Sequence, residues 1–143
     1  MRILFDTNVV LDVLLDREPY SSNSAKLFSK VESGEISGYV CATTITTIQY
    51  LARKVIGDHS AMEEIKKLLK LFEIAPVNRA VLETAVSSAF KDFEDAVVHE
   101  SALYKEAQGI VTRDPNGFKK SKIHVFSPEE LLLMLESKSA PVS

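Results

Sequence analysis

Short apolar runs separated by long amphipathic segments constrain the fold of this chain more than any other feature. The clearest runs are residues 3–5, 38–42 and 110–112, and two shorter ones lie at residues 72–75 and 123–126. A short apolar run without alternation is typical of a strand buried on both faces, as in a parallel sheet. Because helical patterns lie between these runs, the sequence predicts an α/β layer sandwich with a mostly parallel sheet and right-handed crossovers.

The segments between the predicted strands repeat apolar residues at helical spacing. We expect helices over residues 9–14, 25–31, 45–55, 58–71, 78–90 and 92–108, and a last helix that begins at Pro128. Thr43 or Thr44, Asp58 and Ser127 are the expected caps of three of these helices. The chain therefore reads as one domain over residues 1–136, followed by a frayed tail over residues 137–143.

Composition and charge exclude several classes of protein. The chain has 143 residues, the length of one domain, and a hydrophobic content of 45% that supports a buried core rather than disorder. Its formal net charge of −3 excludes a broadly basic nucleic-acid binder, so any such contact needs a local patch. The single cysteine, Cys41, excludes a disulfide scaffold and a cysteine-rich zinc site. Because no stretch resembles a signal peptide or a membrane span, we expect a cytoplasmic protein without membrane contacts.

Acidic residues follow two of the predicted strands and open one predicted helix. Asp6 and Asp114 lie just after strand runs, where ligands bind in open α/β sheets, and Asp92 and Asp95 share one helical face. Each has an ordinary structural interpretation as well: Asp6 and Asp92 as helix caps, Asp114 as a turn residue. Glu94, between the two helical aspartates, is interpreted as a solvated charge.

Carboxylates that converge on one point repel one another, so they need a cation to be stable together. Ligand sets made only of oxygen favour Mg²⁺ or Mn²⁺ over zinc. An ion of this kind serves phosphodiester hydrolysis, because it activates water and neutralises charge on the phosphate.

Three segments together resemble the acidic motifs of the PIN domain family, which includes VapC-type toxins. They are residues 3–12 (ILFDTNVVLD), 92–96 (DFEDA) and 110–114 (IVTRD). The resemblance implies a three-layer sandwich around a five-stranded parallel sheet, and Mg²⁺- or Mn²⁺-dependent cleavage of single-stranded RNA. It also implies that Asp6, Asp95 and Asp114 are catalytic metal ligands, with Asp92 as a further acid at the metal. A small antitoxin protein and a second copy of the chain are the implied partners.

Two positions depart from the family pattern. Family members carry a glutamate on the helix after the second strand, and Gln49 takes that position here. An amide oxygen is still a donor, but it brings no negative charge. Gly117 precedes Phe118 where relatives often have an acid. Both departures predict weaker metal binding.

Polar and basic residues near the motifs are candidate RNA contacts, each with an ordinary role as a cap or a solvated charge. The candidates are Thr7, Asn8, Thr112, Arg113, Arg53, Lys54 and Lys119. Basic side chains would hold phosphates without reading sequence. His99 follows Asp95 by one helical turn, and we interpret it as a partly buried structural residue.

Two alternatives remain open at this point. The loss of an acid at Gln49 fits a catalytically weakened domain that binds RNA or a protein. A phosphatase of the haloacid dehalogenase class also has an aspartate after its first strand, but it needs a second acid where this chain has Asn8. The apolar residues of the third and fourth expected helices fit either the core or a homodimer face.

Overall fold

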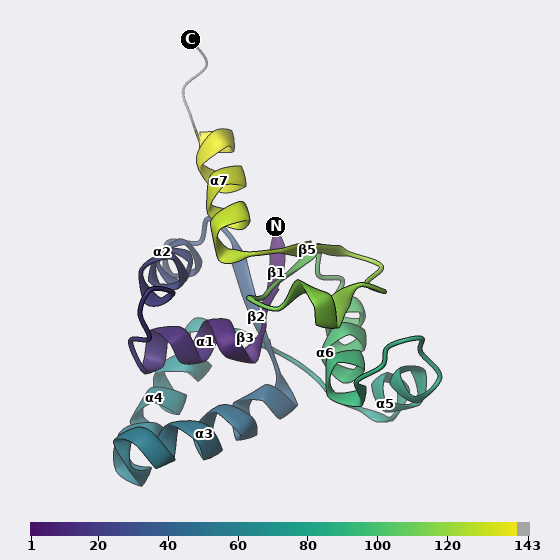
Figure 1. The fold of residues 1–143 in the computed structure, drawn as a ribbon, viewed down its shortest axis with the longest axis horizontal. Coiled ribbons are helices and arrows are strands. Elements are labelled where there is room, and N and C mark those ends of the chain that lie inside the picture. Colours follow the sequence, from purple (N-terminus) through teal and green to yellow (C-terminus); the bar gives the residue numbers. More distant parts are fainter. Residues whose placement is uncertain (140–143) are drawn as a thin grey trace.

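A single five-stranded parallel sheet forms the centre of the structure (Figure 1). The computed structural model describes residues 1–139. The strands are β1 (Arg2–Phe5), β2 (Ser37–Cys41), β3 (Glu73–Ala75), β4 (Gly109–Val111) and β5 (His124–Phe126), in the order β3-β2-β1-β4-β5. In β1, Leu4 pairs with Tyr39 on one side and with Ile110 on the other. The predicted parallel α/β sandwich is therefore confirmed.

Helices cover both faces of the sheet. The seven α-helices of the described residues are α1 (Thr7–Leu14), α2 (Ser21–Glu32), α3 (Ala42–Ile56), α4 (Asp58–Leu71), α5 (Arg79–Val86), α6 (Phe93–Tyr104) and α7 (Pro128–Ser139), with a 3₁₀ turn, η1, at Pro115–Phe118. Figure 1 shows α5 and α6 on one side of the sheet and the remaining helices on the other. In these residues no helix has the length and apolar character needed to cross a lipid bilayer.

The two faces of β1 belong to two separate apolar cores, since side chains alternate along a strand. Ile3 and Phe5 pack in the larger core, with residues from α1, α2, α3, α4 and α7. Leu4 packs in the smaller core, which is built from α5, α6 and η1. Together the two cores bury Ile3, Leu4 and Phe5 completely, while Arg2 at the start of β1 is exposed. The carboxyl end of this central strand is thus held rigidly from both sides.

Helix starts differ from expectation at two places. Helix α3 begins at Ala42 with Cys41 as its cap, so Thr43 and Thr44 lie inside the helix. Gly57 rather than Asp58 precedes α4. The Ser127 cap is confirmed, because its hydroxyl accepts from the Glu130 N–H while Glu130 accepts from the Ser127 N–H, each at 3.1 Å.

Helix ends differ as well, by several residues. Helix α5 stops at Val86 instead of residue 90, and α6 stops at Tyr104 instead of residue 108. Helix α7 runs to Ser139, so residues 137–139 continue the last helix and do not begin a frayed tail. The other residues of that expected tail, 140–143, lie outside the described part of the chain.

Candidate active site

Asp6 is fixed at the carboxyl end of the central strand. It caps α1, with one carboxylate oxygen accepting from the Thr7 N–H at 2.8 Å. The other oxygen accepts from the Thr112 hydroxyl at 2.8 Å. Asp6 is almost fully buried, so these bonds hold it in one orientation. The capping role expected for Asp6 is confirmed, and it also aims the carboxylate.

Thr112 connects the first acidic motif to the last. Its hydroxyl donates to Asp6 and accepts from the Asp114 N–H at 3.0 Å. Asn8 donates to the same hydroxyl at 3.4 Å and accepts from the Arg113 N–H at 3.2 Å. Thr112 is fully buried. The segments that follow β1 and β4 are therefore tied together by side chains.

The middle acidic motif, residues 92–96, reaches the same place from the start of α6. Asp92 caps this helix, with its carboxylate accepting from the Asp95 N–H at 2.9 Å. Glu94 and Asp95 occupy the first turn. The dipole of a helix favours negative charge at this end, which offsets part of the repulsion among the three acids.

These acids line one open cleft of about 440 Å³, here called the acidic cleft. Its lining residues are Asp6, Thr7, Asn8, Leu11, Arg17, Leu51, Asp92, Glu94, Asp95, Arg113, Asp114 and Phe118. The four predicted metal-site acids thus come together, with Thr7, Asn8 and Arg113 beside them. Arg53, Lys54 and Lys119 are not part of this lining. Arg53 and Lys54 instead lie over the ring of Tyr50 on α3.

The crowding of these carboxylates changes their acidity. Burial, assisted by the charges of Asp92, Asp6, Asp114 and Glu94, raises the pKa of Asp95 to about 6. Burial also raises the pKa of Asp6 despite the opposing hydrogen bonds from Thr112 and Thr7, and the charges of Glu94 and Asp114 raise it further. The cleft therefore disfavours its own full ionisation and favours an added positive charge.

Gly117 keeps the space in front of Asp95 open. A Cβ atom at this position would lie 2.6 Å from one carboxylate oxygen of Asp95 and 3.8 Å from one of Asp114. Any larger side chain would therefore displace the Asp95 carboxylate. The missing acid before Phe118 is explained by this crowding.

The structure does not bring Gln49 into the acidic cleft. Leu51, two residues later on α3, lines the cleft, and two residues correspond to about 200° of rotation around a helix. The position on the face of Leu51 one turn earlier is Thr47. Since α3 contains no acidic residue at all, it supplies no carboxylate to the cleft.

Glu94 and Arg17 line the cleft although their sequence context gave them no role. Glu94 was interpreted as a solvated charge, and only the direction of α6 reveals that it faces Asp6. Arg17 is held by Asp12, a fully buried acid on α1, at 2.8 Å. An acid on the apolar side of a helix signals a buried partner, but the sequence does not say which one.

His99 lies behind the cleft and has a structural role. It is buried, and its ring nitrogen Nε2 accepts from the Lys122 N–H at 3.0 Å. Its Nδ1 pairs with Glu100 at 3.1 Å. These contacts anchor the loop after η1 to α6, so the interpretation of His99 as a buried structural residue is confirmed.

The donors of the cleft fit a hard divalent cation in their chemistry. Five carboxylates, the amide of Asn8 and the hydroxyl of Thr7 offer oxygen donors, the ligand type of Mg²⁺ and Mn²⁺. Within residues 1–139, no three acidic, histidine or cysteine side chains surround a common point as a closed ligand set. The expected fit of these residues to a divalent cation therefore rests on their position in one cleft and on the raised pKa values of Asp6 and Asp95.

Removing the Asp95 charge should stabilise the metal-free protein at neutral pH. The pKa of about 6 lies above the ordinary 3.8, so protonation of Asp95 stabilises the fold below about pH 4, and this stabilisation is lost as pH rises through 6. We expect Asp95→Asn to melt at a higher temperature than the unmodified chain at pH 7 in EDTA, with the difference vanishing near pH 4. Asp16→Asn is the matched control, since Asp16 is exposed. An equal response of both variants would contradict the account.

Comparison with known proteins identifies a family for this chain. A family model described as PIN domain matches residues 2–116. Ribonuclease VapC1 of Aquifex aeolicus is 25% identical over 134 residues, which cover 90% of this chain and 92% of the relative.

Solved structures have the same fold. A Mycobacterium tuberculosis toxin, VapC20, described as cleaving the sarcin-ricin loop, has a TM-score of 0.67 at 14% identity and covers 80% of this chain and 92% of its own. VapBC2 from Rickettsia felis, bound to a promoter DNA fragment, has a TM-score of 0.66 at 14% identity, with 89% and 98% covered. Since the family model spans all three acidic motifs, the chain belongs to the PIN domain family.

Proposed function

We propose that this protein is a metal-dependent endoribonuclease that cleaves single-stranded RNA, as the toxin of a toxin–antitoxin pair. The observation that carries the proposal is the convergence of five carboxylates from β1, β4 and α6 in one cleft that two arginines also line. Membership of the PIN domain family supports it, as does the name of the Aquifex relative, a ribonuclease.

Asp6, Asp95 and Asp114 would hold Mg²⁺ or Mn²⁺, with Asp92 and Glu94 at the rim of the cleft. When bound, such an ion acts as a Lewis acid on the phosphate and lowers the pKa of water. Thr112 and the N–H of Thr7 keep the Asp6 carboxylate oriented without help from a ligand. Gly117 leaves the approach to Asp95 and Asp114 unobstructed.

Arg17 and Arg113 would bind the phosphates of the strand. Both line the cleft, and both bond to the buried carboxylate of Asp12. This acid fixes the direction of each guanidinium before a ligand arrives, which lowers the entropy lost on binding. Lys119 lies with Lys91 and Lys120 around a neighbouring hollow that shares Asp92 and Asp95 with the cleft. These lysines are placed to hold the strand beyond the cut.

An antitoxin and a second copy of the chain are the proposed protein partners. One structure of the same fold is described as a toxin–antitoxin complex from Klebsiella pneumoniae. On α3 and α4, the apolar side chains of Tyr50, Val55, Met62 and Leu69 are exposed and offer a face for such a chain. Ile48, Leu68 and Phe72, by contrast, are core residues and not interface candidates. We place the protein in the cytoplasm with its RNA substrate.

The alternative of a catalytically weakened domain that only binds has less support from the structure than from the sequence. It rests on the amide at Gln49, which projects away from the cleft that Leu51 lines. Glu94 supplies a carboxylate instead, close enough to Asp6 to raise its pKa. A haloacid dehalogenase-type phosphatase is set aside because the chain belongs to the PIN domain family.

Cleavage of single-stranded RNA by the purified protein should require Mg²⁺ or Mn²⁺ and stop in EDTA. Asp6→Asn keeps a residue that caps α1 but removes the charge, so its rate should fall by about 100-fold or more, the scale for losing one charge-stabilising group. Circular dichroism and the melting temperature check that the variant is folded, and Asp16→Asn is the control for charge. A folded Asp6→Asn variant that cleaves at the unmodified rate would contradict the proposal.

Substitutions at Glu94 and at Gln49 should differ in their effect on activation by Mn²⁺. Glu94→Gln removes a charge that faces Asp6, so we expect weaker Mn²⁺ activation, measured as a higher Mn²⁺ concentration for half-maximal cleavage. Gln49→Glu adds a charge outside the cleft lining and should leave that concentration unchanged. A Gln49→Glu variant with clearly tighter Mn²⁺ activation would restore the binding-only alternative.

A further inference from the structure

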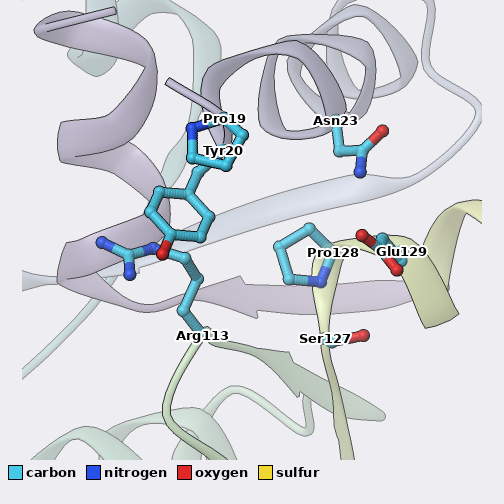
Figure 2. Close-up of a pocket in the computed structure, with 7 residues that line it drawn as sticks. All are labelled: Pro19, Tyr20, Asn23, Arg113, Ser127, Pro128 and Glu129. Atoms are coloured by element: carbon cyan, nitrogen blue, oxygen red, sulfur yellow. The ribbon is translucent and has the colours of Figure 1, made fainter. Parts of the chain in front are cut away.

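Another hollow, distinct from the one lined by lysines, lies beside the acidic cleft and is here called the second hollow (Figure 2). The chemistry described above gives it no role. It measures about 380 Å³, within the range of small-ligand sites. The start of α2 borders it with Tyr20 and Asn23, and the start of α7 borders it with Pro128 and Glu129. Arg113 closes the side toward the acidic cleft.

Arg113 lines both the acidic cleft and the second hollow, so the two are neighbours on the surface. A polymer with one phosphate in the acidic cleft would pass Arg113 and place its next unit at the second hollow. That unit in RNA is a nucleoside, whose base needs a flat surface and a polar edge to bind. The hollow offers both.

The flat surface consists of Tyr20 and Arg113. The guanidinium carbon of Arg113 lies 3.9 Å from the centre of the Tyr20 ring, and the ring is 44% exposed. Bases stack on aromatic rings and on arginine planes, and this stacking tolerates every base. Figure 2 shows the ring and the guanidinium side by side at the edge of the hollow.

Asp12 gives this surface a fixed geometry. It accepts from Arg113 Nε at 2.5 Å and from Arg113 Nη2 at 3.1 Å, and it is fully buried. An arginine held by two bonds to a buried acid cannot swing freely into solvent. The stacking platform is therefore preformed, which distinguishes it from a mobile surface arginine.

The polar edge consists of Asn23 and Glu129. Within residues 1–139 neither side chain has a hydrogen-bond or ion-pair partner, so both are free to meet a ligand. A carboxylate repels phosphate, so Glu129 favours a base over a phosphate in this hollow. A carboxylate accepts from the N1–H and the N2–H₂ of guanine together, whereas uracil offers it a single N–H, at N3.

We propose that the second hollow is a nucleobase subsite, which binds guanine next to the cleaved phosphate. This proposal rests on the proposed RNA function for its position relative to the cut. Tyr20 and Arg113 provide stacking. Glu129 favours guanine over uracil, because guanine offers it two N–H groups and uracil offers one.

Sequencing the ends of RNA fragments tests the specificity of this subsite. We expect the unmodified protein to favour guanine over uracil at one fixed position beside the cut. Glu129→Gln should reduce that discrimination by about 10-fold, because an amide oxygen accepts less strongly than a carboxylate and the amide can also donate to a uracil carbonyl. Glu136→Gln, a charge-matched change at an exposed site on the same helix, should leave the profile unchanged. Tyr20→Ala should raise KM more than it lowers kcat.

Binding without cleavage separates the subsite from the proposed function. GMP and UMP are titrated into ¹⁵N-labelled protein in EDTA, and the backbone amides of Asn23 and Glu129 are followed by NMR. We expect GMP to bind more tightly than UMP, with the difference lost in Glu129→Gln. If GMP binds in this way but no RNA is cleaved under any metal condition, the subsite stands and the nuclease proposal fails. If RNA is cleaved but Glu129→Gln changes no base preference and GMP moves neither amide, the subsite is wrong. A response of these amides only to an antitoxin peptide would also overturn it.

Discussion

The repulsion among carboxylates at one edge of a parallel sheet is the constraint on which the rest of this structure depends. Asp6 and Asp114 arrive there because β1 and β4 are parallel neighbours, and Asp95 arrives with the start of α6. Burial is the largest cause of the raised pKa values of Asp6 and Asp95, and the neighbouring carboxylates raise both values further. The helix dipoles of α1 and α6 relieve part of this repulsion, and a divalent cation would relieve more.

Rigid support holds these charges in place. The central strand is buried on both faces, and the Thr112 hydroxyl links Asp6 to the Asp114 backbone. A second, positive unit stands beside the acids, in which the buried Asp12 carboxylate directs Arg17 and Arg113. Fixed negative groups beside fixed positive groups suit a ligand whose phosphates bind both a metal ion and arginines. The positive unit also reaches the hollow at Tyr20, because Arg113 lines it.

The sequence predicts those features that follow from chain order alone. Asp6 and Asp114 can be placed because each directly follows an apolar strand, and strand ends meet at one edge of a parallel sheet. The side chains of a helix that reach a cleft are harder to predict, because the packing of the helix on the rest of the chain decides which of them do so. On α3 the lining of the cleft includes Leu51 and not Gln49, and on α6 it includes Glu94. The pair of Asp12 with Arg113 joins residues 101 positions apart, and no local pattern encodes it.

The central claim is that the acidic cleft binds a divalent cation. Titration of ¹⁵N-labelled protein with Mn²⁺ tests it most directly, because this paramagnetic ion broadens the NMR signals of nearby amides. The account predicts selective broadening at residues 6, 95, 114 and 117 at low Mn²⁺ concentration, and its loss in Asp6→Asn. Uniform broadening along the chain, or broadening centred away from these residues, would contradict the claim.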